Sequence, residues 1–186
     1  MLRVSNLTLS RGGRSLVNNL DFKVMPGEAL LITGANGSGK STLASAIASN
    51  FKADSGSIEI SGKLGVLLQN IEIDFPISVE DFIDLAGTAE ANNELINRLI
   101  SEEIRGKKIT QLSVGQLQRV EIAQVLRLNP DIYLLDEPFS AQDEENTELL
   151  IEILKSLKAN GKGIMIINHI QLNLDGLIDE VLNLSR

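Results

Sequence analysis

A glycine-rich segment, GANGSGKST at residues 34–42, matches the pattern G-x-x-x-x-G-K-[ST]. Glycines let backbone N–H groups approach a phosphate without a Cβ in the way. Lys40 can reach the β- and γ-phosphates of a nucleotide, and the Ser41 hydroxyl can bind Mg²⁺. A βα turn without a ligand is the alternative, but every position of the pattern is filled. The segment therefore predicts a nucleotide site made of Gly34, Ala35, Asn36, Gly37, Ser38, Gly39, Lys40, Ser41 and Thr42.

Two adjacent carboxylates, Asp136 and Glu137, follow the apolar run IYLL. Ligands of parallel α/β sheets bind beyond the carboxyl ends of the strands, so we expect this pair beside the phosphate loop. There Asp136 can hold Mg²⁺ through water, and Glu137 can act as the general base on an attacking water. Adjacent carboxylates alone are commonly a solvated strand end, and it is the phosphate loop that favours the catalytic interpretation.

The chain has a single histidine, His169, which follows the apolar run GIMIIN. A lone histidine is often structural. Here it follows a strand of the buried type, so it can lie at the same sheet edge as the two carboxylates. In that place we expect it to sense the γ-phosphate and orient the attacking water.

Hydrophobic periodicity predicts the elements that position these residues. Alternation with period 2 predicts strands, continuous apolar runs predict strands buried on both faces, and apolar residues three and four apart predict helices. The expected strands cover residues 3–10, 18–24, 28–33, 55–61, 62–69, 131–135, 163–168 and 180–185, and the expected helices cover 41–50, 78–86, 92–104, 116–128 and 146–160.

The order of these elements predicts one α/β domain over residues 1–186. Strand, helix, strand implies parallel crossovers, hence the core of a P-loop NTPase with a parallel sheet flanked by helices. The N-terminal strands predict an antiparallel β subdomain. Residues from about 72 to 115 are helical and interrupt the rhythm, so we expect an inserted helical subdomain there.

Composition excludes several classes of function. Hydrophobic residues make up 43% of the chain, and the formal charge of −8 argues against a nucleic-acid partner, whose binding proteins are basic. The absence of cysteine excludes disulfides and thiolate metal sites. The N-terminal residues have no apolar h-region, and no apolar run approaches the ~18 residues of a membrane span. We therefore expect a soluble, cytoplasmic chain.

A second candidate anion site lies in QLSVGQLQRVEIAQ, residues 111–124, whose small, polar start is typical of a helix N-terminus. The order GANGSGKST, Gln69 after a strand, LSVGQ, LLDEP, SAQD and His169 resembles the nucleotide-binding domain of ABC ATPases over nearly the full length. Many NTPases share the phosphate loop. LSVGQ about twenty residues before LLDEP is much more specific to this family.

The resemblance implies ATP and Mg²⁺ as ligands and ATP hydrolysis as the activity. In this family the signature caps the γ-phosphate held by a second domain, so Ser113, Gly115 and Gln116 are expected to act in trans. The partner is then a second ABC ATPase domain, and we expect a homodimer. Gln69 matches the Q-loop glutamine, which senses Mg²⁺, and Asp143 matches the D-loop aspartate, which crosses the dimer interface.

Two departures from the family pattern bear on these expectations. Val114 stands where the signature usually has glycine, and a β-branched residue would be awkward if the backbone φ were positive there. No aromatic residue lies near Arg11, where the family places the ring that stacks on adenine. Arg11 can stack its guanidinium on the base instead, or the base is held loosely.

The resemblance further implies a subunit that drives a separate integral membrane permease, peripheral on the inner face of the cell membrane. A soluble, non-transport ABC ATPase, of the cluster-assembly or ATP-switch type, is the alternative. Some segments resemble the ATPase of the haem exporter of cytochrome c biogenesis, and others resemble zinc or manganese importers, so the substrate stays open. Candidates for an apolar contact with the permease, or else for subdomain core, are Phe75, Ile77, Val79 and Phe82.

Overall fold

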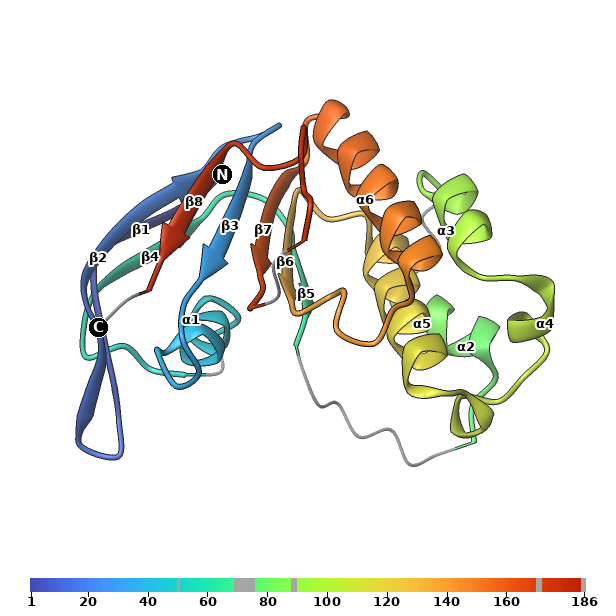
Figure 1. Ribbon diagram of the computed structural model, residues 1–186, viewed down its shortest axis with the longest axis horizontal. Coiled ribbons are helices and arrows are strands. Elements are labelled where there is room, and N and C mark those ends of the chain that lie inside the picture. The colour runs from blue at the N-terminus through green and yellow to red at the C-terminus, as the bar shows by residue number, and fades with distance from the viewer. Residues whose placement is uncertain (50, 69–75, 88–89, 170–171, 185–186) are drawn as a thin grey trace.

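Two sheets form the core of the computed structural model, which describes residues 1–49, 51–68, 76–87, 90–169 and 172–184 (Figure 1). The first sheet is antiparallel and has the order β2-β1-β4. Its strands are β1 (Leu2–Arg11), β2 (Arg14–Val24) and β4 (Ser55–Ile60). The turn that joins β1 to β2 is made of Gly12 and Gly13, both with positive φ, which suits a two-residue hairpin.

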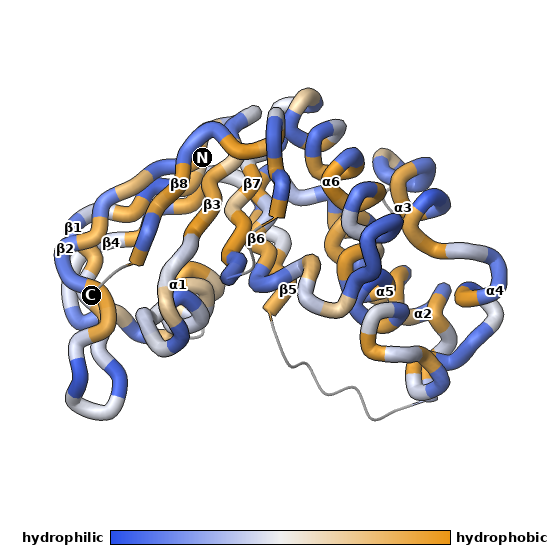
Figure 2. The backbone as a smooth tube through the Cα atoms, in the orientation of Figure 1, coloured by the Kyte–Doolittle hydropathy of each residue, from blue (hydrophilic) through white to orange (hydrophobic). Residues whose placement is uncertain are grey.

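The second sheet is parallel and has the order β5-β6-β7-β3-β8. Every residue of the neighbouring strands β6 and β7 is buried, as expected for strands covered on both faces. Figure 2 shows this as apolar colour along β3, β6 and β7. The strands are β3 (Ala29–Thr33), β5 (Leu64–Leu67), β6 (Ile132–Asp136), β7 (Gly163–Ile167) and β8 (Glu180–Asn183).

Two hydrophobic cores lie on opposite faces of the parallel sheet, because side chains alternate between faces along a strand. Ile132 and Leu134 of β6 pack with the antiparallel sheet and with α1 (Lys40–Ile47). Tyr133 and Leu135 pack on the other face with α5 (Val114–Leu128) and α6 (Glu144–Ala159). The predicted α/β fold, with its parallel sheet, flanking helices and antiparallel β subdomain, is confirmed.

Short helices lie between β5 and β6 in the chain and pack beside α5 and α6 (Figure 1). They are α2 (Val79–Asp84), α3 (Asn93–Leu99), α4 (Glu102–Arg105) and the 3₁₀ turn η1 (Ile109–Gln111). The single helix predicted for 92–104 is wrong, because Ile100 is extended and Ser101 caps a new helix. Both helices bury apolar residues at compatible spacing, so periodicity alone joined them.

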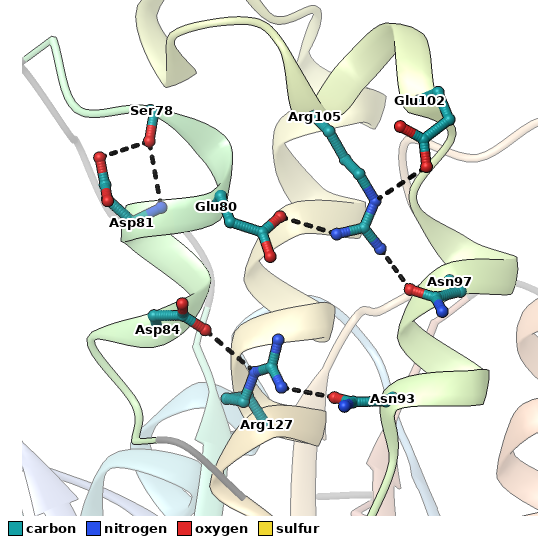
Figure 3. A network of polar contacts seen from close by, with 9 residues as sticks. All are labelled: Ser78, Glu80, Asp81, Asp84, Asn93, Asn97, Glu102, Arg105 and Arg127. Carbon is teal, nitrogen blue, oxygen red and sulfur yellow. Dashed lines mark hydrogen bonds and ion pairs between the residues drawn. The ribbon is translucent and has the colours of Figure 1, made fainter. Parts of the chain in front are cut away.

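Two arginines tie these helices together (Figure 3). Arg105 of α4 contacts Glu80 of α2 at 2.7 Å and also Asn97 of α3. Arg127, near the end of α5, contacts Asp84 of α2 at 3.2 Å. The helices between β5 and β6 are therefore held to one another by charge as well as by apolar packing.

Within the described ranges, no helix has the length and apolar character needed to cross a bilayer.

Candidate nucleotide site

The loop between β3 and α1 borders a cavity of about 470 Å³ at the carboxyl ends of the strands. The loop turns sharply, with positive φ at Gly34, Gly37 and Gly39. Loop residues form one wall of the cavity, the β1–β2 hairpin another, and Glu137 contributes from beyond β6. The lining residues are Arg11, Leu16, Asn36, Gly37, Gly39, Lys40, Ser41, Thr42 and Glu137.

Two loop glycines are required by close packing as well as by conformation. A Cβ at Gly39, whose φ is 103°, would lie 3.0 Å from Leu16 Cβ. A Cβ at Gly34 would lie 2.7 Å from the carbonyl oxygen of Leu184 and from Ser38 Oγ. A side chain at Gly34 would therefore clash with the backbone of Leu184, and one at Gly39 would press on Leu16.

Lys40 is buried, and its ammonium lies over the loop. Nζ donates to Gly34 O at 2.8 Å and to Ala35 O at 3.1 Å. An ammonium has three N–H groups, so these contacts fix the charge at the centre of the loop. The loop N–H groups, the start of α1 and this charge together form an anion site.

Asp136 ends β6 and is 3% exposed. Burial, and then the charge of Glu137, raise its pKa to about 6, while a hydrogen bond with Ser41 opposes the rise. Its Oδ1 is buried and has no hydrogen-bond partner in the part of the chain that the structure describes. An orphaned carboxylate oxygen beside a hydroxyl is the donor set that Mg²⁺ takes together with nucleotide phosphates, so the residues present fit the ion.

Glu137 and His169 contact each other at the same edge of the sheet. His169 Nδ1 lies 2.7 Å from Glu137 Oε1. Their strands are neighbours, with Asp136 of β6 paired to Ile167 of β7, so both side chains follow the sheet at one level. Glu137 has a left-handed φ of 53°, and its N–H donates to Ile167 O at 2.8 Å. The pair can therefore hold a water at the mouth of the cavity.

The signature segment begins α5 but does not line this cavity. The Ser113 hydroxyl accepts the N–H of Gln116, and Gln116 Oε1 accepts the N–H of Ser113 at 3.0 Å, which forms a capping box. A Cβ at Gly115 would lie 2.4 Å from the carbonyl oxygen of Ala141. Val114 is the first helical residue, so the concern over a positive φ there was unfounded, and its side chain is 77% exposed.

Three further predicted site residues have different placements. Arg11, at the end of β1, lines the cavity. Asp143 is exposed and caps α6 by accepting the N–H of Asn146 at 2.9 Å, which lowers its pKa. Gln69 lies outside the described residues.

Sequence reasoning missed three residues around this site. Leu16 lines the cavity opposite Gly39. Gln118 and Gln142 hydrogen-bond to each other, Gln118 also donates to the backbone carbonyl of Glu137, and Gln142 also donates to that of Gly115. A signal was present for Gln118, which is a polar residue on an amphipathic helix, two residues after the signature.

A phosphate loop, a lone buried carboxylate oxygen and a glutamate–histidine pair at one end of a parallel sheet define a nucleotide-binding α/β ATPase. A family model described as ABC transporter matches residues 17–140. The chain belongs to this family, as an ATP-binding and ATP-hydrolysing subunit.

Relatives and solved structures are similar over the whole chain. An ABC transporter ATP-binding protein of Methanocaldococcus jannaschii is 33% identical over 194 residues, covering 100% of this chain and 74% of the relative. A zinc import ATP-binding protein of Hahella chejuensis is 31% identical over 191 residues, covering 100% and 75%. The dimeric structure of a bacterial ABC transporter cassette has a TM-score of 0.85 at 26% identity, covering 100% of this chain and 94% of that chain.

Proposed function

We propose that two copies of this chain pack head to tail with two ATP molecules between them and drive a membrane permease. One observation carries the proposal: the signature LSVGQ forms the start of α5, yet it does not line the nucleotide cavity of its own chain. Similarity to a dimeric cassette supports the arrangement. Ser113, Gly115 and Gln116 would then contact the γ-phosphate held by the partner.

Each residue of the chain's own cavity has a task in hydrolysis. Lys40 and the loop N–H groups bind the phosphates, and Arg11 and Leu16 lie where the base would enter. Ser41 and Asp136 would hold Mg²⁺, which when bound neutralises charge on the phosphate oxygens. Glu137 would take a proton from the attacking water. His169 contacts Glu137 through Nδ1, so its Nε2 would be the ring nitrogen available to the γ-phosphate.

The permease would dock on the helices between β5 and β6, which we propose form a lobe over residues 72–115. Val79 and Phe82 are buried in the core, so they are not available for an apolar contact with a partner. Ile77 is partly buried and packs against the same core, and Phe75 lies outside the described residues. We propose Leu85 for this contact instead, because it lies at the end of α2 and is 65% exposed. Docking would place the chain on the inner face of the membrane.

The transported substrate would be selected by the permease. Relatives named for zinc import and manganese transport favour the metal-importer resemblance over the haem-exporter one. Relatives named for hemin and taurine import support the same direction of transport with other substrates. Import is therefore the direction we propose.

Light scattering of Glu137→Gln, with and without ATP and Mg²⁺, tests the sandwich. The change keeps the shape of the side chain but removes the base, so a dimer with bound ATP should accumulate and the mass should double. Adding Ser113→Arg to the same chain should return it to the monomer mass. A monomer mass for Glu137→Gln under both conditions contradicts a homodimeric sandwich.

Purification from membranes tests the permease. The wild-type chain should retain an apolar integral membrane protein after mild detergent extraction, and Leu85→Glu should lose it. Retention of a soluble scaffold instead would support the cluster-assembly alternative.

A further inference from the structure

Two glutamines connect the first turn of α5 to the backbone of Glu137. Gln142 Nε2 donates to Gly115 O at 3.2 Å and to Gln118 Oε1 at 2.7 Å. Gln118 Nε2 in turn donates to Glu137 O at 3.0 Å and to Ser140 Oγ at 3.2 Å. The signature turn and the proposed base are thus joined within one chain by two side-chain amides.

The backbone carbonyls at the two ends of the bridge fix the orientation of both amide groups. The carbonyl oxygens of Gly115 and Glu137 can only accept hydrogen bonds, so each glutamine must turn its NH₂ toward one of them. Rotating either amide would set two oxygens against each other, which excludes the alternative assignment. Both amides therefore act as donors toward the backbone, and Gln118 Oε1 accepts a hydrogen bond from Gln142.

Direct packing also joins the two ends of the bridge. The carbonyl of Ala141 approaches Gly115 so closely that a Cβ there would lie 2.4 Å away, so Ala141 packs directly on the signature turn. The left-handed backbone of Glu137 is costly for a residue with a side chain and persists only where its surroundings hold it. Gln118 supplies part of that restraint at the carbonyl, and Ile167 supplies part at the N–H.

We propose that Gln118 and Gln142 are positioning residues, which set the backbone of Glu137 according to the position of the signature turn. The inference rests on the proposed function, in which that turn contacts the nucleotide of the partner. Movement of the turn as the sandwich closes would then reach the base that serves the chain's own nucleotide. The bridge would couple the two ATP sites of the dimer.

The variant Gln142→Leu tests the bridge because it keeps the volume and removes both donors. We expect kcat to fall about 10-fold or more, since a small misplacement of a catalytic group has effects up to about 100-fold, while KM and the affinity for ATP change less than about twofold. Gln118→Leu should lose more, because Gln118 contacts Glu137 directly. Should Gln142→Leu fail to fold, Gln142→Asn keeps the amide but cannot span the distance, and the same loss in kcat is expected.

Gln124, which lies on α5 like Gln118, provides a matched control. Gln124 Nε2 donates to Phe82 O at 2.7 Å, a comparable bond that touches no residue of the site. Gln124→Leu should therefore change kcat by less than about twofold even if it lowers the melting temperature as much as Gln142→Leu does. Equal losses of kcat in the two variants would mean that general destabilisation, rather than positioning, is responsible.

A variant with both glutamines replaced shows whether Gln142 acts through Gln118 or whether the two residues affect kcat independently. If Gln142 acts through Gln118, the variant with both leucines should have the kcat of Gln118→Leu alone. Losses that multiply, or wild-type kcat in Gln142→Leu, would overturn the proposal. Glu137→Gln distinguishes a failure of the proposed function from a failure of the bridge. Wild-type turnover in Glu137→Gln would contradict the proposed function itself. An inactive Glu137→Gln together with a fully active Gln142→Leu would contradict the bridge alone.

Discussion

At the scale of single residues, a few atoms of the site are held by close contacts with their neighbours. Lys40 Nζ is held on two loop carbonyls, and Asp136 is buried beside Ser41. Gly115 lies under the carbonyl of Ala141. Each of these contacts tolerates only one residue type, so substitutions there should affect function well before they unfold the chain.

Lys40→Ala should abolish ATP binding and hydrolysis. Among the residues that line the cavity, the one other cation is Arg11, which lies at the rim and not at the centre of the loop. Titration with a fluorescent ATP analogue and phosphate release measure both effects. Lys52→Ala, an exposed lysine after α1, is the control and should bind normally. Wild-type turnover in Lys40→Ala would refute the phosphate-loop assignment.

Gly115→Ala should displace the first turn of α5, since its Cβ would lie 2.4 Å from a backbone oxygen. We expect ATP hydrolysis to fall at least about 10-fold, with binding to the monomer retained, because in the proposed sandwich the turn would contact the partner's nucleotide. Gly106→Ala, where a Cβ meets nothing within 4 Å, should hydrolyse ATP at the wild-type rate. Equal rates for the two variants would contradict this role of the turn.

Arg11 is the only charged residue on the hairpin side of the cavity among those that line it. A guanidinium stacks on either purine, and Leu16 adds only an apolar contact, so ATP and GTP affinities should differ little. Competition of the two nucleotides for a fluorescent analogue measures the ratio. A strong preference for ATP would mean that another residue recognises the base.

At the scale of elements, α5 links the signature, the sheet and the helices between β5 and β6. Gln118 contacts the backbone of Glu137, and Gln124 and Arg127 contact α2. Apolar residues between them lie in the core that α5 shares with β5 and β6. Glu121 is a carboxyl group on the same helix that is half-buried, and burial raises its pKa to about 7.

The raised pKa of Glu121 should make the free energy of unfolding depend on pH. The folded chain keeps a proton that the unfolded chain releases above the ordinary pKa of 4.5, so Glu121 lowers the free energy of unfolding as pH rises from 4.5 to about 7. Glu121→Gln should remove that fall and stabilise the chain at pH 8 by about 1–2 kcal/mol, allowing for solvent screening. Urea unfolding at several pH values, with exposed Glu148→Gln as control, measures it; equal gains in both variants would contradict the assignment.

At the scale of the whole molecule, the proposed head-to-tail sandwich would make each ATP site from two chains. Lys40→Ala removes the phosphate loop's charge and Ser113→Arg blocks the signature, so each variant alone should be inactive. In a mixed dimer, one site combines the intact loop of one chain with the intact signature of the other. Random mixing should therefore restore roughly a quarter of wild-type hydrolysis, since half of the dimers are mixed and one site in each is intact.

Phosphate release from the two variants, apart and mixed, measures this complementation. Mixing Lys40→Ala with Glu137→Gln is the control, because both changes affect the chain's own cavity and neither chain then supplies an intact one. No gain on mixing with Ser113→Arg would place the signature in the same chain as its nucleotide.

Much of the fold was determined by local sequence. Period-2 alternation and continuous apolar runs predicted the strands, because burial on one face or two leaves that imprint directly. The order of strands and helices predicted the parallel sheet. The break between α3 and α4 was missed, because Ser101 restarts a helix without disturbing the apolar spacing.

The candidate site also has a part that the sequence predicted and a part that it did not. The phosphate loop is contiguous in sequence, so its residue types and spacing could be interpreted without a structure. The contact of Glu137 with His169, the bridge through Gln118 and Gln142, and the burial of Val79 and Phe82 join residues far apart in the chain or depend on which side of an element faces inward. Only the tertiary structure decides such contacts, because strand order and helix packing set which side chains meet.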